Sequence, residues 1–353
     1  MGIYIALVIV CAANGAFMDK YHNRCNKNFR RWLYFTFILL FFISALRFEV
    51  GQDYTDTYVL AYQRVVAGVK NVRMDIAVKT IYKGMAKLHA NAQWIFVITS
   101  FIINWFACKS IAMQSPDCKL SFLIYLCGTF YFFSMNGVRQ SVAMMLFYYS
   151  FRFIEEKNLK VYLVINGIGA LFHSSALLFL PLYFVLNKKI KFKFKLALII
   201  GTIVTSKIAV PIIASVLMKT HYSMYLTNGY YSAQETMNFS MYLNIMLFLI
   251  YEWFSKKEKL DELGHIYDNI HFCGVIVSLL ATSLPLMIRI FMSFRFIEFL
   301  SVPYLLNMQL KKRNRQIIEP ATMVLYFAYF VWGVLIKNGN TVLPYKTIFC
   351  KLW

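Results

Sequence analysis

The chain has 353 residues, of which 59% are hydrophobic, 18% aromatic and only 15% charged. Soluble domains average roughly 45–50% apolar and about 25% charged residues, so this composition excludes an ordinary soluble globular protein. The apolar residues form continuous runs, which favours membrane-spanning helices over the alternating strands of a β-barrel. The formal net charge of +21 lies mostly in loops between these runs. We therefore attribute it to membrane topology and expect no binding to nucleic acid.

The seven cysteines show no C-x-x-C spacing, and the six histidines do not cluster. Most of the cysteines fall in or beside apolar runs, where a thiol behaves as a small hydrophobic side chain. The sequence therefore predicts no disulfide framework, no metal site and no cofactor.

The first apolar run, residues 3–18, has no basic region before it and no clear small-residue cleavage site, so we predict a membrane span rather than a signal peptide. About twelve apolar runs occur along the chain, and several are shorter than the roughly 20 residues that a span usually needs. They cover residues 3–18, 32–46, 93–113, 120–135, 141–153, 161–172, 176–187, 196–218, 239–254, 270–288, 296–310 and 319–336. The prediction is an all-α polytopic membrane protein, with residues 1–353 in a single integral membrane domain.

Basic loops follow alternate apolar runs. They lie at residues 20–31, 152–160, 188–195, 256–259 and 311–315, and with Lys109 and Lys119 they hold 22 of the 37 Lys and Arg residues. The positive-inside rule places these loops in the cytoplasm and both termini outside. No predicted span carries an acidic residue in its middle third, which argues against a carrier driven by protons or sodium.

The segment 47–92 is too long for a simple connection between two spans, and the charge rule places it outside. Met74, Val78, Ile81, Met85 and Leu88 recur at helical spacing, and Lys79, Lys83 and Lys87 lie on another face. We predict an amphipathic helix that lies flat in the outer membrane interface. The alternative is a helix packed within a small outer domain.

Four polar clusters mark the outer ends of the apolar runs, and the first contains Arg47, Asp53 and Tyr54 around Gly51. The planar guanidinium of Arg47 suits a phosphate, because it donates two parallel hydrogen bonds. Asp53 is then expected to orient or deprotonate a sugar hydroxyl. The alternative is an ion pair between Arg47 and Asp53 that fixes the start of the outer loop.

The second cluster holds Asn136, Arg139 and Gln140, at the turn between two apolar runs. Asn136 is expected to cap the following helix, which places Arg139 in its first turn. A cation at that position opposes the helix dipole, so we expect an anion nearby. A helix N-terminus with an arginine is also a suitable anion site.

The third cluster is His173-Ser174-Ser175, which interrupts an apolar stretch. Histidine side chains titrate near neutrality, so His173 is a candidate general base or phosphate ligand. In the alternative, the serines form a turn and the histidine binds a backbone carbonyl. The fourth cluster is Arg289 and Arg295, which are expected to bracket an outer turn at residues 290–294. These arginines are expected either to bind phosphate or to contact lipid head groups.

The chain resembles the EpsG family of bacterial polysaccharide-assembly proteins, which are similar to Wzy-type polymerases. The resemblance rests on short motifs in a shared order along nearly the whole chain: Arg47, Gly51, Asp53 and Tyr54; Asn136, Arg139 and Gln140; Phe172-His173-Ser174-Ser175 and Pro181; Arg295 and Pro303; and Pro344-Tyr345. It implies a helical enzyme similar to the glycosyltransferase-C architecture. The short loop at 47–92 departs from a large periplasmic domain, so acceptor recognition would rest on small loops.

The resemblance further implies a multi-pass enzyme of the bacterial cytoplasmic membrane, with its site facing outside. Such an enzyme joins oligosaccharide repeats carried on undecaprenyl pyrophosphate to make O-antigen, capsule or exopolysaccharide. The partners expected are that lipid-linked glycan, membrane lipid, a flippase and a chain-length regulator.

The residues divide into three expected roles. Arg47, Arg139, Arg289 and Arg295 would bind the pyrophosphate, Asp53 or His173 would accept the hydroxyl proton, and Tyr54, Asn136, Gln140 and Ser174 would position the substrate. Two other functions remain open from the sequence. One is a flippase for lipid-linked oligosaccharides, and the other is a glycan ligase or acyltransferase.

Overall fold

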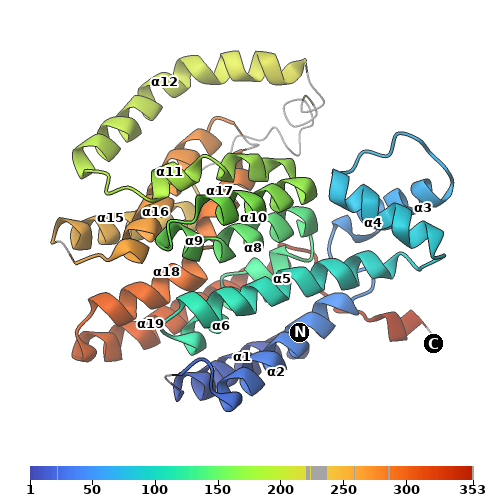
Figure 1. The fold of residues 1–353 in the computed structure, drawn as a ribbon, viewed down its shortest axis with the longest axis horizontal. Coiled ribbons are helices and arrows are strands. Elements are labelled where there is room, and N and C mark those ends of the chain that lie inside the picture. Colours follow the sequence, from blue (N-terminus) through green and yellow to red (C-terminus); the bar gives the residue numbers. More distant parts are fainter. Residues whose placement is uncertain (22, 220–222, 224–236, 258, 285–286, 352–353) are drawn as a thin grey trace. The chain divides into compact units, whose positions relative to one another are not determined.

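The computed structural model describes residues 1–353 except 22, 220–222, 224–236, 258, 285–286 and 352–353. The described residues are almost entirely helical (Figure 1). The extended pairing among them is one isolated antiparallel bridge between Arg47 and Thr347. The chain forms two compact units: unit 1 contains residues 1–180 and 298–353, and unit 2 contains residues 181–297.

Unit 1 is a bundle of helices with short irregular connections. Its helices are α1 (Gly2–Asp19), α2 (Lys27–Ala45), α3 (Leu60–Val66), α4 (Ile76–Lys87), α5 (Gln93–Gln114), α6 (Cys118–Cys127), α7 (Phe130–Phe133), α8 (Val138–Tyr149), α9 (Phe151–Glu155), α10 (Leu159–Phe172), α18 (Glu298–Tyr304) and α19 (Lys312–Phe330). Short π-helical turns occur at Tyr54–Val59, Leu305–Gln309 and Val331–Ile336, and 3-10 turns at Ser174–Phe179 and Ile348–Lys351.

Several of these helices begin at a side chain that accepts a hydrogen bond from the free N–H groups of the first turn. Asn26 accepts from the N–H of Asn28, and Asp117 accepts from that of Leu120. Helix α1 packs on α2 and α6. A Cβ at Gly15 would lie 2.6 Å from the Lys119 backbone, so the absence of a side chain at Gly15 permits the close approach of α1 and α6.

Helices α8 and α10 form an antiparallel hairpin that is connected through α9. The position of a Cβ on Gly169 lies 3.4 Å from the Ala143 Cα, so the two backbones are in near contact there. The rings of Phe147 and Phe179 stack with centroids 4.1 Å apart. These contacts fix the register of the hairpin, and with it the positions of the polar residues at its ends.

Unit 2 contains α11 (Leu182–Leu186), α12 (Phe192–Met218), α15 (Phe239–Lys256), α16 (Glu262–Ala281) and α17 (Met287–Arg295). Helix α16 is central, because it packs against each of the other four. Its buried His271 ring lies 2.8 Å from the side-chain oxygen of Asn244 in α15. Met241, Ala281 and Phe291 form an apolar cluster between α15, α16 and α17.

Five described helical segments are long and apolar enough to cross a membrane: Gly2–Asp19, Gln93–Gln114, Glu262–Ala281, Met287–Asn307 and Lys312–Ile336. Shorter apolar helices cover Cys118–Cys127, Leu159–Phe172 and Ser174–Leu186. Together they make the chain a multi-pass helical membrane protein. The count of about twelve spans and the single membrane domain stay predictions.

The sequence prediction was wrong about the segment between Arg289 and Arg295, which is helix α17 rather than a turn. Residues 287–302 contain no glycine or proline to interrupt a helix, and Phe291 is buried against α15 and α16. Helix α16 also begins at Glu262, before the expected start at residue 270. Asp268 therefore lies within a candidate span, and Glu298 stands near the middle of another, Met287–Asn307. These positions remove the absence of acids as an argument against ion coupling.

The amphipathic pattern in the outer loop does form a helix, α4. Val78 and Met85 are buried against other helices of unit 1, and Lys79, Lys83 and Lys87 are exposed. The helix packs on α3, α5 and α10. Its apolar face is therefore covered by protein at these residues, as in the alternative of a packed outer helix. An orientation in the membrane interface stays a prediction.

Candidate functional site

The site begins where the chain leaves α2 and pairs with a segment from the far end of unit 1. The N–H of Phe48 donates to the Lys346 carbonyl at 2.9 Å, and the N–H of Ile348 donates to the Leu46 carbonyl at 3.0 Å. The N–H of Gly51 donates to the Thr341 carbonyl at 3.0 Å. Residues 46–51 are therefore held along residues 341–348, and both segments lie at the end of the bundle that carries the polar clusters predicted from the sequence.

Arg47 is only 1% exposed. Its guanidinium donates to the carbonyls of Ser44 and Met135 and lies 4.6 Å above the Phe96 ring. Burial lowers the pKa of Arg47 to about 10, so the group remains protonated at neutral pH. Because protein atoms enclose this cation, the geometry favours a positioning role beneath the site over direct contact with a ligand.

Asn136 connects the first two polar clusters. Its side-chain oxygen accepts from the N–H of Asp53 at 3.3 Å, and its amide nitrogen donates to the Asn340 carbonyl at 3.0 Å. Gly51, with φ at +96°, lies so close to this turn that a Cβ would be 2.6 Å from the Met135 carbonyl oxygen. The sequence prediction gave Asn136 a helix-capping role, whereas the structure has no side-chain cap on α8. The amide instead joins three segments of the chain.

Tyr54 is buried and belongs to a network with Gln93, the first residue of α5. Its hydroxyl donates to the Gln93 side-chain oxygen at 2.6 Å. The Gln93 amide in turn donates to the carbonyls of Ala45 and Arg47. Burial raises the pKa of Tyr54 to about 12, so the phenol keeps its proton and acts as the donor. The Tyr54 ring stacks on Phe96 with centroids 4.3 Å apart.

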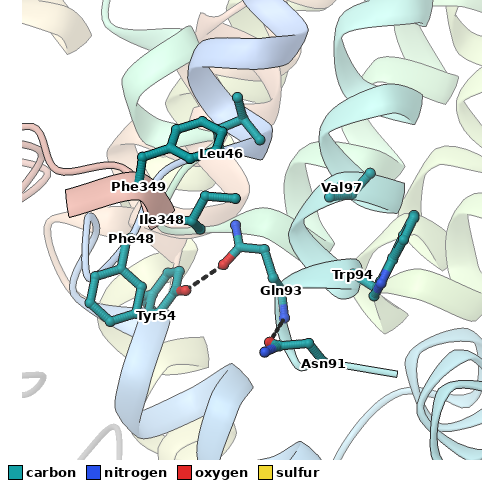
Figure 2. A pocket seen from close by; sticks show the side chains of 9 residues that line it. All are labelled: Leu46, Phe48, Tyr54, Asn91, Gln93, Trp94, Val97, Ile348 and Phe349. Carbon is teal, nitrogen blue, oxygen red and sulfur yellow. Dashed lines mark hydrogen bonds between the residues drawn. The ribbon is translucent and has the colours of Figure 1, made fainter. Parts of the chain in front are cut away.

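A cavity of about 620 Å³ opens beside this network (Figure 2). Aromatic and aliphatic side chains form most of its wall, and the Tyr54–Gln93 hydrogen bond forms a polar patch within it. The lining residues are Leu46, Phe48, Tyr54, Asn91, Gln93, Trp94, Val97, Ile348 and Phe349. Its size and its mixed lining are typical of sites for small organic ligands.

Arg139, in the first turn of α8, forms an ion pair with Asp75, the residue before α4. Its backbone N–H donates to the Tyr58 hydroxyl at 3.3 Å. The side chain of Arg139 is 28% exposed. The anion that we expected beside this cation is therefore a carboxylate of the protein, while part of the Arg139 side chain stays exposed. Gln140, the next residue, is buried.

His173 follows α10, one turn beyond Gly169, and Arg139 lies one turn before Ala143 in α8. Because Gly169 and Ala143 meet in an antiparallel hairpin, His173 and Arg139 lie at the same end of it. His173 is half-buried, and Ser174 is exposed at the start of the 3-10 turn. Three of the four predicted clusters therefore gather at one end of unit 1.

The fourth cluster belongs to unit 2. Arg289 is exposed on α17, and Arg295 at the end of that helix is buried with its guanidinium 5.0 Å from the Phe296 ring centroid. The structure does not place these arginines relative to unit 1. No group of three or more His, Cys, Asp or Glu side chains among the described residues is arranged to hold a metal ion.

The sequence prediction missed two residues of this site, Gln93 and Asp75. Gln93 is the first residue of α5, and Asp75 is the residue before α4. Polar side chains at such positions commonly serve as helix caps. The neighbours of these two residues in space lie far away in the sequence, so pattern reading gave no reason to single them out. Asn340 contributes a backbone carbonyl, for which side-chain identity gives no signal.

The sequence model of the EpsG family matches residues 30–347. This match covers all ten residues that the sequence singled out, and it confirms the resemblance drawn from their order. Comparison with curated proteins finds no match, and comparison with solved structures finds none either. Because the family match spans nearly the whole chain, and with it both compact units, the protein belongs to the EpsG family, whose members are Wzy-like polymerases.

Proposed function

We propose that this protein is a polysaccharide polymerase that joins oligosaccharide repeats carried on undecaprenyl pyrophosphate. The reaction would occur at the outer face of the bacterial cytoplasmic membrane, with a flippase and a chain-length regulator as partners. The observation that carries the proposal is the gathering of three polar clusters at one end of unit 1, where Asn136 contacts Asp53 and His173 lies at the same hairpin end as Arg139. A glycosyltransferase-C-like architecture with about twelve spans is part of the same proposal.

The reaction forms one glycosidic bond and breaks one. A hydroxyl oxygen of the acceptor sugar attacks C1 of the donor glycan, and the C1–O bond to the lipid pyrophosphate breaks. The hydroxyl proton passes to Asp53 or His173, and undecaprenyl pyrophosphate leaves. Since pyrophosphate is a good leaving group, orientation of the two substrates contributes much of the rate, and base strength matters less.

Arg139 is the cation in unit 1 best placed to bind the pyrophosphate, because its side chain is partly exposed at the gathered end. Arg47 supports it from below by fixing the Met135 carbonyl next to Asn136. Tyr54, Asn136, Gln140 and Ser174 would position the sugars. Arg289 and Arg295 enter the proposal through their sequence pattern alone.

The cavity beside Tyr54 supports a lipid-linked substrate. Phe48, Trp94 and Phe349 offer aromatic surface to isoprene units or sugar rings, and the Tyr54–Gln93 pair offers polar contacts nearby. Aromatic side chains bind both kinds of group through their faces.

The test is the glycan length in a deletion strain that carries wild-type protein, Arg139→Ala or the matched control Arg73→Ala. Arg73 is an exposed arginine in the segment 47–92, two residues before Asp75, the ion-pair partner of Arg139. Loss of a preorganised cation should lower the rate roughly 10²–10³-fold, by analogy with lost oxyanion-hole donors. We expect single repeats on the lipid in the deletion strain and with Arg139→Ala, and long polymer with wild type and Arg73→Ala.

Other outcomes assign other functions. Repeats that accumulate on the cytoplasmic face of the deletion strain would identify a flippase. Long polymer that stays unattached or unmodified would identify a ligase or acyltransferase. Polymer of normal length with Arg139→Ala at normal protein levels would contradict the proposed role of that arginine.

A further inference from the structure

Unit 2 contains a buried ion cluster that joins three helices. The Lys195 ammonium of α12 lies 2.6 Å from an Asp268 carboxylate oxygen in α16 and 2.7 Å from a Glu252 oxygen in α15. Lys195 is 0% exposed, and both acids are buried. A buried charge is tolerated only where opposite charges compensate it closely, so this lysine is committed to the two carboxylates.

A cavity of about 660 Å³ lies against this cluster, and Glu252 forms part of its wall. The other lining residues are Lys189, Ile190, Lys191, Phe192, Ser255, Lys256, Leu260 and His265. They come from the segment before α12 and its first residue, the end of α15, the loop after it and the start of α16. All of them belong to unit 2, so the cavity is defined within one compact unit.

The charges around the cavity are unbalanced. Within the described part of the chain, Lys189, Lys191 and Lys256 form no ion pair with a carboxylate, and Glu252 is the one acid in the lining. Glu252 contacts Lys195, which it shares with Asp268. Lys256 is in addition held with its ammonium 4.6 Å from the centre of the Phe192 ring, which is itself in the wall. Three ammonium groups therefore border the cavity, against the single carboxylate of Glu252.

We propose that this cavity binds a phosphate-bearing anion. Ammonium groups bind phosphate oxygens through charge-assisted hydrogen bonds, and a concave wall excludes part of the competing water. The volume lies within the range of about 300–1,000 Å³ that is usual for small-molecule sites. The positive-inside rule assigns the lining loops to the cytoplasm, so the ligand is a different molecule from the glycan donor used outside.

Two sources can supply this chemistry: a soluble organic phosphate or the head group of an anionic lipid. The competing explanation is that the lysines serve membrane topology alone and bind nothing in particular. If topology alone explains the lysines, every lysine in these loops should contribute equally to anion binding. The proposal instead assigns anion binding to the lysines that line the cavity. The difference allows a charge-matched test.

The test compares two double variants of the full-length protein, purified in a neutral detergent without phosphate. One is Lys191→Gln with Lys256→Gln, which removes two lining cations. The control is Lys193→Gln with Lys257→Gln, which removes two exposed neighbours that do not line the cavity. Both variants lose the same net charge from the same two segments.

Pyrophosphate binding is measured by isothermal titration calorimetry, with Arg139→Ala added to wild type and to both variants so that the pyrophosphate site proposed at Arg139 does not contribute. We expect the lining variant to bind at least about tenfold more weakly than wild type, since two charge-assisted contacts are lost, and the control variant to stay within about twofold. Equal weakening in both variants, or no saturable binding to wild type, would overturn the proposal. A thermal unfolding curve for each variant confirms that both are folded.

Native mass spectrometry from nanodiscs then separates the two sources. Wild type and the lining variant are reconstituted with phosphatidylcholine alone or with added phosphatidylglycerol. Retention of phosphatidylglycerol by wild type but not by the lining variant assigns the site to a lipid head group. Pyrophosphate binding that is unchanged by phosphatidylglycerol assigns it to a soluble phosphate. Phosphatidylglycerol retention by both proteins, together with equal pyrophosphate binding, would count against the site.

Discussion

Asn136 and Asp53 are 83 residues apart in the sequence, yet the side-chain oxygen of Asn136 accepts a hydrogen bond of 3.3 Å from the Asp53 N–H. The same amide holds the Asn340 carbonyl. One side chain thus sets where the candidate base Asp53 lies relative to the start of α8. The contact orients the backbone of Asp53 and leaves its carboxylate to other interactions.

Replacement of Asn136 by alanine removes both hydrogen bonds. We expect Asn136→Ala to lower the free energy of unfolding by about 1–3 kcal/mol, because a partly buried N–H and a carbonyl lose their partner. The measurement is thermal unfolding in detergent, with the exposed Asn71→Ala as the control. An unchanged melting temperature for Asn136→Ala would show that the two contacts contribute little.

The close approach at Gly51 gives a second prediction. Gly51→Ala adds a Cβ 2.6 Å from the Met135 carbonyl at a positive φ, and we expect a loss of about 1–3 kcal/mol from strain together with loss of polymer. Gly68 also has a positive φ, +77°, but has nothing within 4 Å of its Cβ position. Gly68→Ala therefore measures the backbone strain alone. If Gly51→Ala and Gly68→Ala have the same melting temperature, the close approach to Met135 contributes nothing to the stability.

The Arg139–Asp75 ion pair separates a structural role from a ligand-binding role. Arg139→Gln should lower polymerisation roughly 10²–10³-fold if its charge faces the pyrophosphate. Asp75→Asn keeps that cation and removes its internal partner, so we expect polymer of near-normal length. The readout is repeat number on a gel at matched protein levels. Equal losses in both variants would mean that Arg139 acts through the ion pair.

His173 and Asp53 compete for the role of general base. Loss of a general base typically lowers the rate about 10²–10⁴-fold. We compare His173→Gln with the exposed His89→Gln, and Asp53→Asn with the exposed Asp56→Asn, in a polymerisation assay across pH. The base is the residue whose conservative variant loses the rate and also flattens the pH profile. Near-normal rates for both His173→Gln and Asp53→Asn would leave substrate positioning as the main contribution.

The apolar runs and the helical spacing of residues 74–88 were sufficient to predict the helical class and α4. Those signals depend on side-chain burial, which hydrophobicity records directly. The motif Pro344-Tyr345 marked the last stretch of the chain, but its pairing with residues 46–51 could not be predicted, because backbone hydrogen bonds between distant segments leave no mark on side-chain identity. The sequence predicted that Arg47 binds a phosphate; its enclosure by Ser44, Met135 and Phe96 depends on tertiary packing and could not be read from the sequence.

Lys195 shows a different limit of sequence reasoning. It stands in a lysine-rich stretch that reads as a solvated loop, yet it is buried against Asp268, which is 73 residues away. Its neighbours Lys191 and Lys193 are exposed. The charge pattern identifies the stretch as basic but does not indicate which lysine is buried in an ion pair with a carboxylate.

Unit 1 is interrupted in the sequence by the whole of unit 2. During synthesis, residues 46–51 are made early, but their hydrogen-bonding partners at 341–348 appear only after residues 181–297 have been translated. This end of unit 1 is therefore completed only when the later segment is made. A chain that stops before residue 341 lacks the partners of residues 46–51, so the candidate site stays unfinished until synthesis is nearly over.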